Sequence, residues 1–143
     1  YAGARMASEE TGCLEGLLDF GSHLGCVIQI LDDLEDWHRL QARDNQILQK
    51  MDWYKNLPAV YTLEVLPAEE KGLFCDVMEG VSRSSEKRQT YVEWVNRSGA
   101  AVFTLTLLAQ EVEAARKALH NNLFLQEPRE ALLTVLTTLA DKI

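Results

Sequence analysis

Prolines occupy three positions in this chain of 143 residues, and each stands where a helix can begin or end. Pro58 and Pro128 open runs of apolar residues at helical spacing, and the first turn of a helix tolerates proline because its N–H groups have no partner within the helix. Pro67 ends the segment that Pro58 opens. The remaining segments repeat apolar residues with a helical period and contain no convincing strand pattern. The sequence therefore predicts an all-α fold.

Helix boundaries follow from the same signals. Ser8, followed by two acids, predicts the start of a helix that runs to about Trp37, because a hydroxyl cap and early acids suit the positive end of the helix dipole. The segment 41–52 consists mostly of polar residues, and its apolar residues show only a weak helical periodicity, so a loop is expected there. A kink or a point of close helix packing is expected at the Ser98-Gly99 pair. Further helices are predicted over 57–66, 68–82 with a break near Gly80, 86–119, and 128–143.

Composition and charge limit the classes of function that the protein can have. A 47% share of hydrophobic residues suits one domain over residues 1–143. The formal net charge of −8 argues against nucleic acid or an anionic membrane as a partner, although a phosphorylated substrate remains compatible if a cation intervenes. No apolar run reaches the roughly 20 residues of a membrane span. Three cysteines without a CxxC spacing are expected to be small buried hydrophobes in a reducing compartment, so we expect a cytoplasmic protein.

The stretch QILDDLEDW, residues 29–37, places four carboxylates near the end of the first predicted helix. At about 100° per residue, Gly21 and Gly25 fall directly below these acids on the same face. Such a face forms a trough without side chains, which suits an apolar ligand or a closely packed helix, and helix packing explains the glycines equally well. Four oxygen-bearing side chains share an arc of about 100°: Gln29, Asp32, Asp33 and Asp36.

The spacing D-D-x-x-D indicates a cation site. Three carboxylates this close repel one another when they are half-buried, so a cation is needed to hold them together. Magnesium fits best, because it prefers oxygen ligands and binds through one or two carboxylates plus substrate phosphate. The sequence therefore predicts a Mg²⁺ site at Asp32, Asp33 and Asp36 that holds a diphosphate at the open end of the trough. A solvated acidic surface is the alternative, because helical surfaces produce this pattern by chance.

The stretch FGSHLGCVIQILDDLEDW resembles the second aspartate-rich motif of the trans-isoprenyl diphosphate synthases, and YAGARMA, WYKNLPAVYTLEVL and PREALLTVLTTLADKI are similar to other parts of the C-terminal half of that family. The resemblance implies a helical bundle of the isoprenoid synthase type around a deep apolar cavity. It implies that the chain is the C-terminal half of a polyprenyl synthetase, a prenyltransferase that ionises an allylic diphosphate with Mg²⁺ and condenses the cation with isopentenyl diphosphate. The complete enzyme would be a homodimer.

The resemblance also assigns roles to single residues. Asp32 would ligate magnesium directly, and Asp33 and Asp36 would ligate it or bond its waters. Gln29 matches the glutamine whose amide oxygen faces the cationic carbon, so Gln29 and Asp32 are the expected catalytic residues. The family's Lys-x-Thr-Leu-Pro segment is altered here, because the lysine appears one place late. Lys55 is therefore expected either to reach a phosphate or to stay solvated.

The first aspartate-rich motif cannot be found in this chain, and the basic residues that bind isopentenyl diphosphate belong to the same missing half. The chain opens without methionine, as though cut from something longer. The missing half, or another chain that supplies it, is thus the expected partner, and the face of Gly21, Gly25 and Ile28 is expected to meet it. The alternative is a non-catalytic helical module that acts as a regulatory or partner subunit. A terpene cyclase of the same fold lacks support, because its second metal motif does not occur in this segment.

Overall fold

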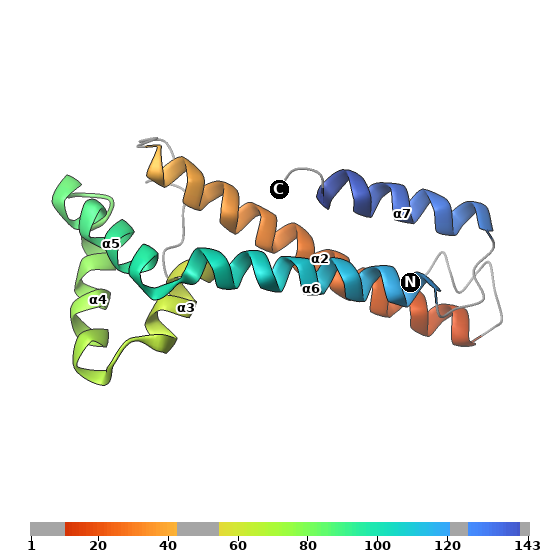
Figure 1. Cartoon of the computed structure of the whole chain (residues 1–143), viewed down its shortest axis with the longest axis horizontal. Coiled ribbons are helices and arrows are strands. Elements are labelled where there is room, and N and C mark those ends of the chain that lie inside the picture. The colour runs from red at the N-terminus through yellow and green to blue at the C-terminus, as the bar shows by residue number, and fades with distance from the viewer. Residues whose placement is uncertain (1–10, 43–54, 121–125, 141–143) are drawn as a thin grey trace. The chain divides into compact units, whose positions relative to one another are not determined.

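The computed structural model describes residues 11–42, 55–120 and 126–140, and all the secondary structure within these ranges is helical (Figure 1). The all-α prediction is confirmed for this part of the chain. The chain divides into two compact units, one made of Tyr1–Leu31 with Leu107–Ile143 and the other of Asp32–Thr106. The predicted helix start at Ser8 and most of the predicted loop 41–52 lie outside the described residues. Helices α2 (Thr11–Gln41) and α6 (Ala100–His120) contribute to both units.

The prolines stand where the sequence places them. Helix α3 (Leu57–Val65) has Pro58 in its first turn, and helix α4 (Ala68–Gly80) follows directly on Pro67. Helix α7 (Gln126–Ala140) carries Pro128 as its third residue. Helix α2 continues to Gln41, one turn beyond the predicted end near Trp37, because Leu40 extends its buried side. Local signals therefore locate helix starts better than they locate the end of α2.

The long helix predicted over 86–119 is wrong as a single element. Helix α5 (Ser85–Ser98) ends where α6 begins, and Gly99 between them has a φ of +78°. This left-handed conformation closes α5 because the Gly99 N–H bonds to the carbonyl of Asn96. The Ser98 hydroxyl, 2.9 Å from that of Thr62 on α3, also accepts the N–H of Ala100. The expected kink is thus a full break.

A substitution at Gly99 should expose the cost of that conformation. Gly99→Ala is expected to lower the free energy of unfolding by about 1 kcal/mol, because the left-handed region crowds a Cβ against the following carbonyl. A Cβ there meets no other atom within 4 Å, so strain is the whole effect. Gly72→Ala is the matched control, in open space inside α4, and should raise stability by about 0.5–1 kcal/mol. Chemical denaturation measures both, and two stabilising alanines would contradict this account.

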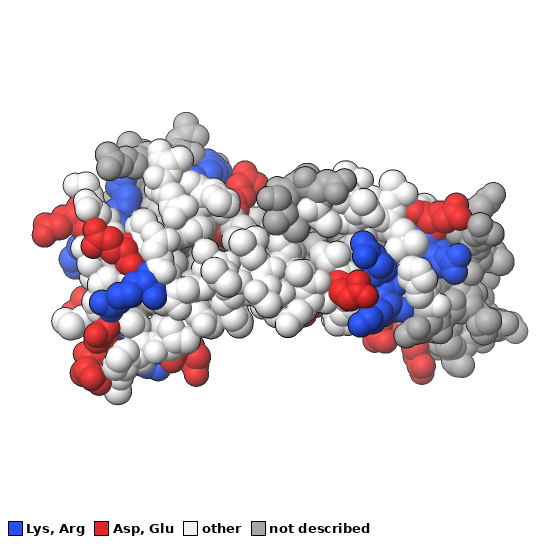
Figure 2. Space-filling model, in the orientation of Figure 1, with Lys and Arg blue, Asp and Glu red and all other residues white. Residues whose placement is uncertain are grey.

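The core of the second unit forms around α5, which packs against both α3 and α4. Phe74 of α4 stacks on Tyr91 and on Trp94 of α5, with ring centroids 5.7 and 5.6 Å apart, and Trp37 of α2 meets Tyr91 edge to face at 6.1 Å. Positive and negative side chains are interspersed over the α4–α5 surface (Figure 2). The core includes Trp37, Leu40, Ala59, Leu66, Phe74, Met78, Val81, Tyr91, Val95 and Ala100.

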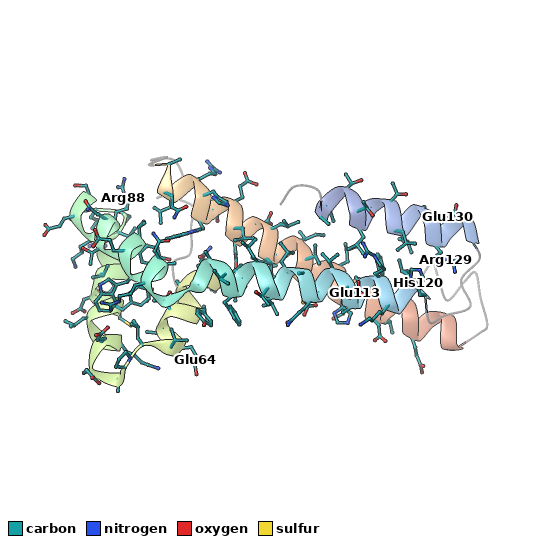
Figure 3. The ribbon with its side chains drawn as sticks, viewed as in Figure 1. Glu64, Arg88, Glu113, His120, Arg129 and Glu130 are labelled. Atoms are coloured by element: carbon teal, nitrogen blue, oxygen red, sulfur yellow. The ribbon has the colours of Figure 1, made fainter. Side chains whose placement is uncertain are left out.

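The first unit buries apolar side chains from three helices. His23 of α2 lies 2.7 Å from a carboxylate oxygen of Glu111 on α6, and this contact joins the two helices. Further along α6 come Glu113 and the exposed His120 (Figure 3). Cys26 is exposed, which corrects the expectation that each cysteine is buried. The buried residues are Phe20, Val27 and Ile30 of α2, Leu108, Ala115 and Leu119 of α6, and Leu136 of α7.

No helix in the described ranges combines the length and the apolarity that a membrane crossing requires.

Candidate functional site

The acids of α2 do not share one environment. Asp32 is exposed, Asp36 is half-buried, and Asp33 is only 8% exposed. Consecutive residues of a helix point about 100° apart, so Asp32 faces solvent when Asp33 faces the interior of the second unit. The predicted cluster is therefore divided between an outer pair, Asp32 and Asp36, which are four residues apart, and an inner aspartate.

The glycines of α2 lie open in the first unit. Gly21 and Gly25 are exposed, and a Cβ built on either meets no atom within 4 Å. Leu18 and Ile28 on the same side of the helix are 50% and 45% exposed. The close helix packing that could explain these glycines is therefore not found among the described residues. These four residues form an apolar strip on α2, beside which the exposed residues of the same unit include Asp19, Ser22 and Gln29.

Asp33 is held by the start of α3. Its carboxylate accepts the backbone N–H of Leu57 at 2.8 Å, and its backbone carbonyl accepts the side-chain amide of Asn56 at 3.1 Å. Asn56 is itself buried, and its Oδ1 accepts no hydrogen bond within the described part of the chain. No local signal in the sequence indicates the link to Asp33, although an asparagine just before a helix that carries proline in its first turn is a common capping residue.

The electrostatics of this region reflect burial and crowded negative charge. Burial raises the pKa of Asp36, the charges of Asp33, Glu35 and Asp32 raise it further, and Arg39 opposes the shift. The pKa of Tyr91 is also raised, first by burial and then by the charge of Asp33. Since each effect disfavours additional negative charge, a bound cation would favour the ionised form of Asp36.

Gln29 and Lys55 are the other predicted site residues, and both are exposed. Gln29 lies on α2 in the first unit, one turn before Asp32 along the helix. Lys55 precedes Asn56, so the contacts of Asn56 and Leu57 with Asp33 bring its backbone beside the acid-bearing turn of α2. The structure thus brings the start of α3 to the acids. The roles of Gln29 and Lys55 stay predictions.

A magnesium site needs several oxygen donors grouped around one point. Among the residues that the structure describes, no three His, Cys, Asp or Glu side chains are grouped so as to hold one metal ion. Magnesium usually keeps several waters and binds through one or two carboxylates plus substrate phosphates. The outer pair, Asp32 and Asp36, offers donors of that kind. The three-aspartate site remains a prediction.

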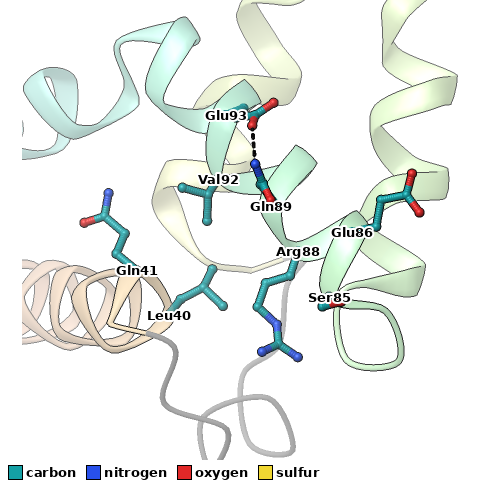
Figure 4. Close-up of a pocket in the computed structure, with 8 residues that line it drawn as sticks. All are labelled: Leu40, Gln41, Ser85, Glu86, Arg88, Gln89, Val92 and Glu93. Atoms are coloured by element: carbon teal, nitrogen blue, oxygen red, sulfur yellow. Dashed lines mark hydrogen bonds between the residues drawn. The ribbon is translucent and has the colours of Figure 1, made fainter.

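A cavity of about 710 Å³ lies elsewhere in the second unit, between the end of α2 and the first turns of α5 (Figure 4). No predicted site residue lines it. Arg88 shares its wall with two carboxylates, and one of them, Glu93, accepts the amide of Gln89 at 3.0 Å. This mixed charge gives the cavity no preference for a diphosphate. Its lining consists of Leu40, Gln41, Ser85, Glu86, Arg88, Gln89, Val92 and Glu93.

Comparison of the chain with protein-family models, with curated proteins and with solved structures gave no match in any of the three.

Proposed function

We propose that this chain is the C-terminal half of a prenyltransferase of the isoprenoid synthase type, which condenses an allylic diphosphate with isopentenyl diphosphate. One observation carries the proposal. The acids Asp32 and Asp36 occupy one side of α2, and by helical spacing that side continues to Gly21 and Gly25. Acids at one end of an apolar strip that contains two glycines suit a substrate that has a charged head and a hydrocarbon chain.

The outer acids would act on the diphosphate head. Asp32 and Asp36, one turn apart, would hold Mg²⁺, which when bound neutralises the charge of the diphosphate leaving group. Burial and then the charges of neighbouring acids raise the pKa of Asp36, so a cation bound there would favour its ionised form. Lys55, exposed beside the acid-bearing turn, would reach a phosphate oxygen.

The exposed side of α2 before the acids would receive the hydrocarbon. Gly21 and Gly25 leave room along the helix, and Ile28 supplies an apolar wall. Gln29 would turn its amide oxygen toward the allylic carbon, where an oriented dipole stabilises developing positive charge. The complete enzyme would need a second set of acids and the basic residues for isopentenyl diphosphate from a complementary half, and we propose that it is a homodimer.

Thermal melting with magnesium and inorganic diphosphate tests this function. The two together should raise the melting temperature by several degrees, and each alone by far less, because the outer acids bind the metal well only when phosphate oxygens complete its coordination. Glu35→Gln is the control, since Glu35 is an exposed acid in the same turn and should leave the joint shift in place. If the shifts in melting temperature were merely additive, or absent, the acids would be a solvated surface cluster. The alternative of a non-catalytic helical module would then be favoured.

A further inference from the structure

Asp33 stands apart from the other acids of α2 by its contacts as well as by its burial. Its carboxylate accepts a backbone N–H from the first residue of α3, 24 residues further along the chain. Its carbonyl accepts the amide of Asn56, the residue just before that helix. Two atoms of one aspartate therefore bind the two residues at which α3 begins.

The first turn of α3 shows why this contact is needed. The N–H groups of Ala59 and Val60 both bond to the carbonyl of Asn56 at 3.0 Å, and Pro58 has no N–H. Leu57 is then the one donor of this turn without a backbone acceptor. Asn56 occupies the capping position but makes no side-chain cap bond, since its amide donates to α2 instead. Asp33, which belongs to α2, therefore provides the capping acceptor for α3 in place of Asn56.

Charge favours the same arrangement. The positive end of the α3 dipole meets a carboxylate, and a hydrogen bond from an N–H to an ionised acceptor is stronger than one between neutral groups. The same burial disfavours a metal at Asp33. Magnesium loses its waters reluctantly, and Asp33, which is 8% exposed as a residue and has one carboxylate oxygen already bonded, leaves little room for a hydrated ion.

We propose that Asp33 is a positioning residue, which caps α3 and fixes that helix to the acid-bearing turn of α2, and that it is not a metal ligand. The metal part of this inference rests on the proposed function, and the capping part does not. Asp33 would act on the site by setting where α3, and with it Lys55, lies beside Asp32.

Three variants separate the two roles. Asp33→Ala removes the acceptor, Asp33→Asn keeps an oxygen acceptor without the charge, and Asp32→Asn alters the outer acid alone. The rate of amide hydrogen exchange at Leu57 shows whether its N–H is protected by the hydrogen bond to residue 33. Exchange should be about tenfold faster in Asp33→Ala, recover most of the way in Asp33→Asn, and stay at the wild-type rate in Asp32→Asn, because a charge-assisted bond contributes on that scale.

The affinity for Mn²⁺ in the presence of inorganic diphosphate shows which aspartates bind the metal. Asp33→Asn should bind within about threefold of the wild type, whereas Asp32→Asn should bind at least about tenfold more weakly, since the loss of a direct ligand should cost no less than the roughly 10–100-fold that the loss of a partner of a ligand costs. Equal losses in the two asparagine variants would make Asp33 a ligand and overturn the inference. Unchanged exchange at Leu57 in Asp33→Ala would overturn it as well. If the wild type binds no Mn²⁺ with diphosphate, the proposed function fails, and the exchange of Leu57 still decides the cap.

Discussion

Phe74→Ala is expected to lower the free energy of unfolding by about 3–5 kcal/mol, the cost of replacing a buried aromatic ring by a methyl group. Phe74 has no exposed surface, and its ring stacks on Tyr91 and Trp94 at interplanar angles of 8° and 7°. The substitution removes both ring contacts and leaves a cavity between α4 and α5. A domain stable by about 5–15 kcal/mol has little margin against such a loss.

Leu73→Ala is the matched control for this experiment. Leu73 precedes Phe74 on the same helix and is 59% exposed, so its truncation should change stability by no more than about 0.5 kcal/mol. Urea titration of both variants, followed by far-ultraviolet circular dichroism, measures the difference. Equal effects at the two positions would mean that α4 does not pack on α5 through Phe74.

Local signals in the sequence were sufficient for much of the fold. Pro58 and Pro128 mark helix starts because a proline lacks an N–H wherever it occurs, and this needs no knowledge of tertiary contacts. The Ser98-Gly99 pair predicts a kink or a point of close packing, but not the end of a helix. A glycine next to serine is compatible with a kink or a break, and the contact between Ser98 and Thr62 of α3 could not be read from the sequence.

The division of the acids depended on a long-range contact. The helical wheel placed Asp33 about 100° from Asp32, yet it could not say which of the two faces the interior. That choice follows from the docking of Asn56 and Leu57 against α2. The sequence pattern also does not distinguish the buried side of α2, which includes Val27, from its open side. Apolar residues occur on both sides, and only tertiary contacts decide which one is covered.

Gly21, Gly25 and Ile28 of α2 are exposed among the described residues, and a partner from outside this chain for this side of the helix stays a prediction. What covers this side remains part of the proposed function. In that function a complementary half covers it, and an enzyme assembled from both halves would allow the role of Asp32 to be tested by catalysis.

Asp32→Ala is expected to reduce prenyl transfer by at least about 10²–10³-fold when the chain is assembled with a half that carries the first aspartate-rich motif. Removing a group that stabilises transition-state charge typically costs this much. Asp32 is exposed on the acid-bearing turn and makes no contact that holds α3, so the loss should come without a comparable loss of stability. Condensation of an allylic diphosphate with labelled isopentenyl diphosphate measures the rate.

Glu35→Gln is the control for this loss, because Glu35 is exposed in the same turn and should retain activity within a fewfold. The chain without its complement should show no transfer, since the proposed site is then half complete. Activity of the isolated chain would contradict the half-site proposal. An assembled enzyme indifferent to Asp32→Ala would exclude this acid from the reaction, because a carboxylate that holds the magnesium neutralising a diphosphate cannot be lost without raising the barrier to ionisation.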